Sequence, residues 1–104
     1  MLSSRLTVFL RSLLLVAVLL AAGCQTSPPV QEMSDARQAI MVAKEAGAAE
    51  HAADDLKEAE KYLKNAEKYL GTRNYAIARR DAMQAKSKAL KALQRSEAAQ
   101  EKDN

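Results

Sequence analysis

The chain has 104 residues, of which 28% are charged and 4% aromatic, and its net charge is +3. This length fits a single domain. One Cys, one His and three Gly exclude Cys/His catalytic pairs, Cys-rich metal sites and glycine-rich phosphate-binding loops. We therefore expect a protein that is not an enzyme and that holds neither a cofactor nor a metal ion.

Residues 1–23 have the pattern of an export signal peptide. Arg5 and Arg11 are the only charged residues before Glu32, and the apolar run LLLVAVLLAA follows them. A membrane-spanning helix needs about 20 apolar residues, so this run is too short to span a bilayer. Positive charges followed by a short apolar run are typical of secretory signals. We expect this segment to direct export rather than to form a buried helix or a membrane anchor.

Small residues and then a cysteine follow the apolar run, in the order Ala21, Ala22, Gly23 and Cys24. This pattern resembles the lipobox of bacterial lipoproteins, with Ala21 where leucine is commoner. The resemblance implies cleavage between Gly23 and Cys24, a diacylglycerol thioether on Cys24, and a fatty amide such as palmitate on the new amino terminus. Two or more acyl chains anchor a protein durably. Gln25 is not the aspartate that retains such proteins in the inner membrane, so the resemblance implies the periplasmic face of the outer membrane.

Residues 24–33 are predicted to form the lipidated amino terminus and an extended tether, because Pro28 and Pro29 restrict φ and disfavour a helix. The rest of the chain is predicted to be all-α, with a helical domain over 34–98 and a polar tail over 99–104. No segment shows the alternation of apolar and polar residues that is typical of a strand.

The first predicted helix has Ser34 as its N-cap and runs to about Ala46, with Gly47 at its end. Its buried face consists of Ala36, Ile40 and Ala43. The second helix begins at Asp54 or Asp55, where Asp55 and Glu58 have capping-box spacing, and ends before Gly71. Its apolar stripe has the three–four spacing of coiled-coil heptads and consists of Leu56, Ala59, Leu63, Ala66 and Leu70.

The third predicted helix has Asn74 as its N-cap and is rich in alanine. Its seam consists of Ala78, Ala82, Ala85, Ala89 and Ala92, flanked by Ile77, Met83, Leu90 and Leu93. Alanine lets helices approach closely but buries little apolar area per residue. A bundle of this size has little stability of its own. We expect it to complete its core against copies of itself or against a partner, with a marginally stable monomer as the alternative.

Most of the predicted helical part resembles a known family. The matching segments are Glu32–Ile40, Glu45–Ala48, Leu56–Leu70, Asn74-Tyr75, and Arg79-Arg80 with Ala82, Ala85 and Ala89. Together they resemble the small proteobacterial lipoproteins catalogued as domain of unknown function 4398. The resemblance spans roughly residues 30–95 and implies no biochemical activity.

A weaker likeness concerns the third helix. Tyr75, Ala78, Ala82 and Ala85 are spaced as in the second helix of a tetratricopeptide hairpin. A single hairpin of that kind cannot bury its own apolar face. We interpret the likeness as shared packing, and predict a three-helix module in which one helix precedes an alanine-rich helical hairpin.

Charge is segregated along the chain. Residues 32–71 carry a net charge of −3, whereas residues 72–95 carry +6. The basic residues of interest are Arg79, Arg80, Lys86, Lys88, Lys91 and Arg95. We interpret them first as charge complementarity between helices together with solvated lysines. The alternative is a surface for an anionic partner, such as lipid headgroups, lipopolysaccharide phosphates, peptidoglycan carboxylates or an acidic protein. The expected compartment excludes nucleic acid.

The aromatic residues and the histidine indicate packing more than chemistry. Tyr62 and Tyr69 are seven residues apart on one helix, and Tyr75 follows the turn. We expect them to pack at a seam between helices with their hydroxyls at the rim; a platform that stacks on glycan is the alternative. His51 has no metal-ligating partner at a suitable spacing.

These patterns predict a non-catalytic lipoprotein of the outer membrane, acting as an envelope structural or adaptor protein. One alternative is a murein-type lipoprotein in contact with peptidoglycan, although such proteins end in a lysine and this chain ends Lys102-Asp103-Asn104. The other alternative is a small accessory subunit of an envelope complex.

Overall fold

The computed structural model describes residues 2–25 and 27–103, with side chains described for 3–19 and 27–103. Every regular element in these ranges is an α-helix, which confirms the all-α prediction. The helices are α1 (Leu2–Gln25), α2 (Val30–Glu45), α3 (Ala48–His51), α4 (Ala53–Gly71) and α5 (Tyr75–Asp103).

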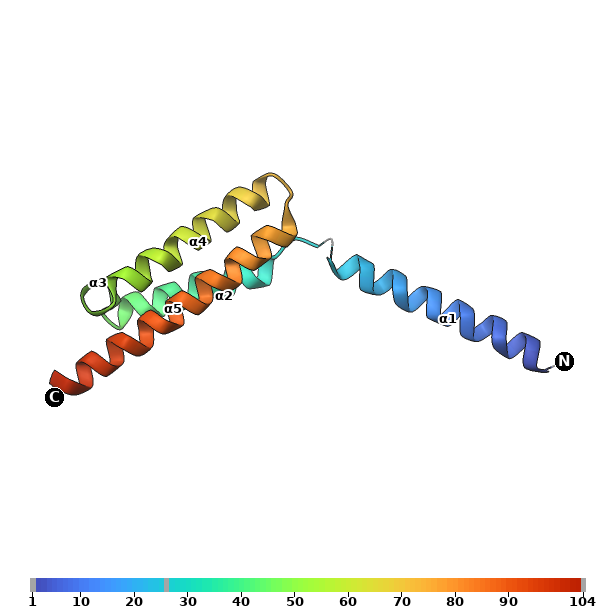
Figure 1. Cartoon of the computed structure of the whole chain (residues 1–104), viewed down its shortest axis with the longest axis horizontal. Helices are drawn as coiled ribbons and strands as arrows, with labels where there is room; N and C mark the ends of the chain where they lie inside the picture. The colour runs from blue at the N-terminus through green and yellow to red at the C-terminus, as the bar shows by residue number, and fades with distance from the viewer. Residues whose placement is uncertain (1, 26, 104) are drawn as a thin grey trace.

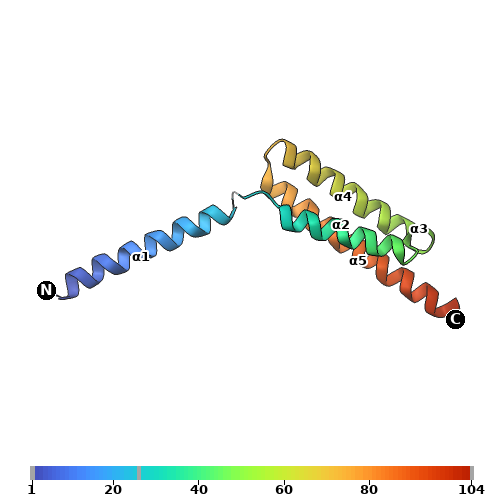
Figure 2. The same cartoon turned by 180° about the vertical axis from the view of Figure 1, so that it is seen from behind.

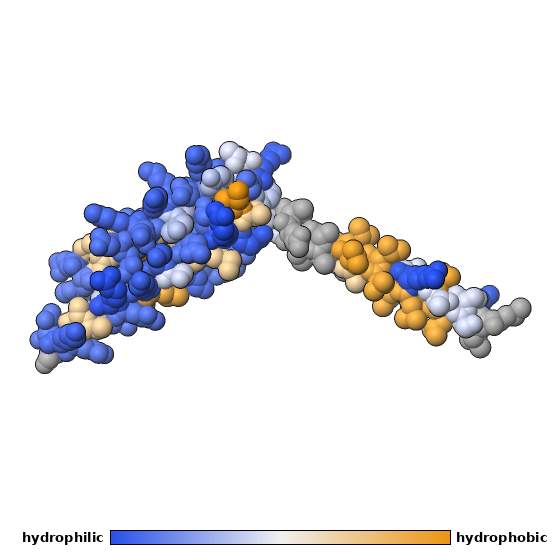
Figure 3. Space-filling model, in the orientation of Figure 1, coloured by the Kyte–Doolittle hydropathy of each residue, from blue (hydrophilic) through white to orange (hydrophobic). Residues whose placement is uncertain are grey.

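Helix α1 projects away from a bundle that α2, α4 and α5 form (Figures 1 and 2). The whole chain is therefore long and thin, with extents of 77 × 33 × 14 Å. Helix α5 is the central helix, because it packs along both α2 and α4. Apolar residues dominate the visible surface of α1, whereas the bundle shows a largely hydrophilic surface (Figure 3). Within the described ranges, no helix is both long enough and apolar enough to cross a membrane.

Small residues from all three long helices make the core. The predicted alanine seam of α5 is confirmed, because all five alanines are 0% exposed. They meet the predicted faces of α2 and α4, including the buried Ile40 and Leu56. A second cluster joins Met33, Ala66 and Ala82 nearer the start of α2. Close approach of helices, rather than large side chains, therefore fills this core.

Helix α2 begins at Val30, so the prediction of a Ser34 N-cap and of a tether reaching residue 33 is wrong. Pro29 occupies the N-cap position, and its carbonyl accepts a hydrogen bond from the Met33 amide at 3.1 Å. Proline is tolerated at the start of a helix, where its missing N–H is not needed. The extra turn buries Met33, which is 1% exposed, and this burial favours the earlier start.

In the connection from α2 to α4, the prediction that Gly47 ends the first helix is confirmed, but the predicted cap of the next helix is not found. Gly47 follows the C-cap of α2 with a φ of +86°, a left-handed conformation that favours glycine. Helix α4 then begins at Ala53 with Ala52 as its N-cap. The predicted capping box is wrong, because Asp55 and Glu58 instead contact α5 through ion pairs.

The turn between α4 and α5 is a Schellman motif whose left-handed residue is Arg73, with a φ of +62°. The Asn74 amide donates to the Tyr69 carbonyl at 2.9 Å, and the Arg73 amide donates to the Leu70 carbonyl at 3.0 Å. Gly71 is the last residue of α4 rather than the residue beyond its end. Asn74 precedes α5, as predicted, and its carbonyl accepts a hydrogen bond from the Ala78 amide.

Helix α5 runs to Asp103, so most of the predicted polar tail is helical. Its last turns lie beside the end of α2, where the Gln100 side-chain amide donates to the Ala46 carbonyl at 2.8 Å. The carbonyls at the end of a helix lack partners within the helix. Gln100 therefore supplies a C-terminal cap to α2 from 54 residues away.

Candidate functional site

The six basic residues of the predicted anionic-partner surface are distributed along α5, and each is paired with a carboxylate. The pairs are Arg79–Glu32, Arg80–Asp81, Lys86–Asp35, Lys88–Glu58, Lys91–Asp55 and Arg95–Asp55. Five of the six bridge α5 to α2 or α4. Complementarity between helices is therefore sufficient to explain these charges, and an anionic partner for them stays a prediction.

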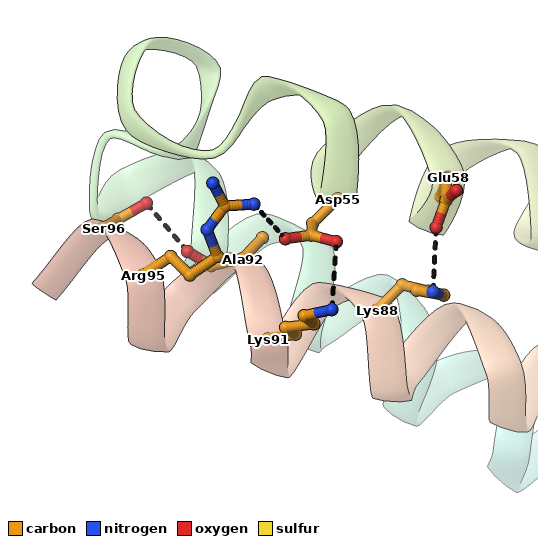
Figure 4. Close-up of polar contacts among 7 residues, drawn as sticks. All are labelled: Asp55, Glu58, Lys88, Lys91, Ala92, Arg95 and Ser96. Atoms are coloured by element: carbon orange, nitrogen blue, oxygen red, sulfur yellow. Dashed lines mark hydrogen bonds and ion pairs between the residues drawn. The ribbon is translucent and has the colours of Figure 1, made fainter. Parts of the chain in front are cut away.

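Asp55 is buried and is the centre of a cluster of two ion pairs (Figure 4). Arg95 donates a hydrogen bond to one carboxylate oxygen at 2.7 Å, and the Lys91 ammonium lies 4.0 Å from the other. The bond from Arg95 is the main reason that the pKa of Asp55 is lowered, and the Lys91 charge lowers it further. Asp55 therefore remains ionised and links the first turn of α4 to α5.

The neighbouring pair joins Lys88 to Glu58 at 2.9 Å (Figure 4). It lies about one turn nearer the start of α5 and one turn nearer the end of α4. The hydrogen bond to Glu58 raises the pKa of Lys88. Ser96, which is fully buried, donates to the Ala92 carbonyl of its own helix at 2.8 Å. Lys88, Lys91 and Arg95 thus join α5 to α4, whereas Ser96 is satisfied within α5.

Arg79 connects the bundle to the segment that leads to α1. Its Nε lies 3.0 Å from a Glu32 oxygen, and its Nη2 donates to the Ser27 carbonyl at 2.9 Å. The start of α2, the start of α5 and the beginning of the described chain after residue 26 therefore meet at one end of the bundle. Sequence reasoning missed this contact, because no local pattern links residues 52 positions apart.

A groove of about 630 Å³ runs between α2 and α5, on the side where Lys86 pairs with Asp35. Met83, Ser87 and Leu90 line it on α5, and Glu32 lines it on α2. A smaller hollow of about 230 Å³ adjoins it and is lined by Val42 and Leu93. Met83 and Leu90 are 59% and 41% exposed, so the prediction that both flank the buried seam is wrong. Both side chains instead lie on the surface of α5, beside the groove.

The tyrosines and the histidine are half-buried. Tyr62, Tyr69 and Tyr75 each keep part of their surface exposed, in keeping with packing at helix seams. His51 ends the short helix α3, next to Gly47. Within the described ranges, no three His, Cys, Asp or Glu side chains are arranged to hold a metal ion.

The predicted lipidation and sorting residues lie at the end of α1. Gly23, Cys24 and Gln25 belong to its helical backbone, but their side chains lie outside the described residues. Cleavage, lipidation and sorting therefore stay predictions from the sequence.

Comparison with known proteins gives one match. The family described as "Domain of unknown function (DUF4398)" matches residues 31–104 of this chain. The matched range begins one residue after α2 starts and includes the rest of the bundle. No curated protein and no solved structure matches the chain.

Proposed function

The chain belongs to the family described as domain of unknown function DUF4398. From the lipobox-like motif that ends at Cys24 and from the two unlike parts of the structure, we propose that it is a lipid-anchored protein of the bacterial outer membrane. Its helical bundle faces the periplasm and acts as a non-catalytic structural or adaptor module. The lipid is a diacylglycerol thioether and a fatty amide on Cys24. Sorting to the outer membrane follows from Gln25.

The observation that carries this proposal is the division of the chain into two unlike parts. Helix α1 leaves its large apolar side chains exposed, with Leu14 and Leu19 at 68% and 70%. A soluble globular protein rarely leaves so large an apolar patch uncovered. The bundle after residue 27 has a largely hydrophilic surface on the face that Figure 3 shows, and it has its own core. An apolar export segment that is removed, followed by an independently folded module, accounts for both parts.

A structural or adaptor role fits the way in which the bundle uses its polar side chains. Asp55 is buried and bound by Arg95, and buried Asp81 is bound by Arg80. Ser96 is bound to its own helix. Buried polar groups that are fully engaged in structural contacts stabilise a scaffold. The open surface for a partner is the groove between α2 and α5.

The anchoring is tested by producing the full chain in a Gram-negative bacterium and measuring the mass of its first mature peptide. We expect a peptide that begins at Cys24 and carries the mass of the diacylglycerol and the fatty acyl chain. Cys24→Ser is expected to remain uncleaved and unlipidated. Ser27→Ala, outside the lipobox, is the matched control and is expected to mature normally. An unmodified Cys24 thiol in the wild-type protein would contradict the proposal.

Sorting is tested separately by membrane fractionation. Gln25→Asp is expected to move the protein from the outer to the inner membrane, whereas Gln25→Asn is expected to leave it in the outer membrane. Equal distribution of both variants would show that the residue after Cys24 does not determine the location.

A further inference from the structure

The exposed face of α5 carries a second heptad pattern, separate from the buried alanine seam. Met83, Ser87, Leu90 and Gln94 follow one another at spacings of four, three and four residues, and all four line the groove. This is the a/d spacing of a coiled coil, with Met83 and Leu90 at one position and Ser87 and Gln94 at the other. The polar residues at alternate positions weaken such a seam and help to specify how many helices it joins.

We propose that a second copy of this chain packs on this groove, with the two α5 helices parallel and side by side. This inference rests on the proposed function, because a shared membrane sets the direction of the two copies. Met83 and Leu90 of one copy would contact the same residues of the other. The four helices α2, α5 and their two counterparts would then enclose the apolar side chains that the single chain leaves exposed.

Charge complementarity favours the parallel arrangement. The α2 wall of the groove carries the acidic Glu32 and Asp35, which already pair with Arg79 and Lys86 of the same chain. The opposite rim carries the basic Lys91, which lines the groove and also lies 4.0 Å from Asp55 on α4. A two-fold axis parallel to α5 places the α2 wall of each copy opposite the basic side of its partner's α5. An antiparallel pair would instead place the acidic walls next to each other, and like charges repel.

The position of the tether favours the same arrangement. Arg79 binds the Ser27 carbonyl, so the chain enters each bundle beside the start of α5. In a parallel pair, both entry points lie at the same end of the dimer. Both Cys24 lipids can then enter one membrane, which two opposed entry points would not allow. Confinement to that membrane raises the effective concentration of the copies and supports a weak seam.

The test is disulfide crosslinking of the full chain in isolated membranes. Ser87→Cys is expected to give several-fold more disulfide dimer than Gln84→Cys, which is exposed on another face of α5. Met83→Cys and Leu90→Cys are each expected to crosslink alone. In an antiparallel pair they would crosslink only when mixed. The wild-type chain, with Cys24 as its only cysteine, provides the baseline.

A second variant separates a real interface from random collision. Leu90→Lys, added to Ser87→Cys, is expected to remove the excess dimer while leaving the helical circular dichroism unchanged. Equal dimer from Ser87→Cys and Gln84→Cys would overturn the proposal. A crosslink only to a different protein would also overturn it, since the groove would then serve another occupant.

Failure of the anchoring remains distinguishable from failure of the dimer. If the mass of Cys24 shows no lipid, the wild-type chain itself will form disulfides through Cys24. The comparison of Ser87→Cys with Gln84→Cys is then repeated in the Cys24→Ser background in detergent, because this uncleaved chain keeps the exposed apolar side chains of α1. Excess dimer there would support the seam without the membrane, and its absence would reject the seam.

Discussion

Arg73 adopts a left-handed backbone conformation that costs an L-residue about 1–2 kcal/mol. Glycine lacks the Cβ atom that causes this cost, so Arg73→Gly is expected to stabilise the protein by about 1 kcal/mol, allowing for the greater entropy of glycine in the unfolded chain. Thermal unfolding followed by circular dichroism measures the change. Arg73→Ala, which keeps the Cβ atom, is the control and is expected to give no gain. An equal gain from both variants would assign the effect to the lost charge instead.

Asp55 makes the stability of the fold depend on pH in the acid range. Its contacts determine whether stability rises or falls with pH. Its pKa is lowered in the folded protein, chiefly because Arg95 donates a hydrogen bond to it. The unfolded chain, with an aspartate pKa of about 3.9, therefore binds more protons at acid pH. The contribution of Asp55 to stability is present above the unfolded pKa and is lost as the pH falls through the lower folded value.

Asp55→Asn tests this dependence. At pH 7 we expect a loss of about 1–2 kcal/mol, because the charged hydrogen bond is replaced by a neutral one. As the pH falls from 5 toward about 2, the gap between wild type and variant is expected to close, since protonated Asp55 also loses its charge. Urea unfolding at several pH values measures the gap. Asp54→Asn, at an exposed neighbour, is the control. A constant gap would show that Asp55 acts by packing rather than by charge.

At the scale of the helix, α5 packs its alanine seam into the core, whereas its other face, with Met83 and Leu90, lines the groove. Ala89 is 0% exposed and lies in the main core cluster. Ala89→Leu is expected to destabilise the bundle by about 1–3 kcal/mol, because added methylene groups force closely packed helices apart. Gln84→Leu on the exposed side is expected to change stability by less than about 0.5 kcal/mol. Denaturant unfolding compares the two, and equal effects would contradict a tightly packed alanine seam.

Periodicity was sufficient to predict the buried faces of α2, α4 and α5, because a repeat of 3.6 residues places each stripe on one side of a helix. It was not sufficient for the helix ends. The burial of Met33 extends α2 past the expected Ser34 cap, and Arg73 takes the conformation expected for glycine. Both outcomes depend on tertiary contacts or turn geometry that no local pattern contains.

The candidate site was predictable only as a set of charges. The sequence predicts that α5 is basic, but the partner of each charge lies on another helix, as with Arg79 and Glu32. The groove was missed because Met83 and Leu90 belong to the same apolar pattern as the core. One signal for the groove was present in the sequence. Met83 and Leu90 together with Ser87 and Gln94 have heptad spacing, separate from that of the buried alanines.

At the scale of the whole bundle, ion pairs connect every pair of its three long helices, α2, α4 and α5. Arg37–Glu67 and Lys44–Glu60 join α2 to α4, and the pairs of α5 complete the set. The acidic first half of the bundle thus surrounds a basic central helix, which explains the segregation of charge along the sequence. Most of these pairs are exposed, and such pairs contribute little stability individually. Together they place unlike charges opposite one another around the apolar contacts between the helices.

The same architecture predicts how the bundle stands on a membrane. The turn at residues 72–74 lies at the end where Arg79 binds Ser27. The opposite end of α5 is about 40 Å away, since the helix rises 1.5 Å per residue. If Cys24 carries the lipid, a fluorophore attached at Asn74→Cys is expected to be quenched by spin-labelled lipid headgroups in vesicles. A fluorophore at Glu101→Cys is expected to remain bright.

The control removes the anchor and keeps the fold. The chain that begins at residue 27 lacks both Cys24 and the apolar α1, so neither fluorophore is expected to respond to the vesicles. Equal quenching at both positions in the lipidated chain would mean that the bundle lies flat on the membrane. The quenching at Asn74 and Glu101 therefore tests the orientation of the bundle independently of crosslinking.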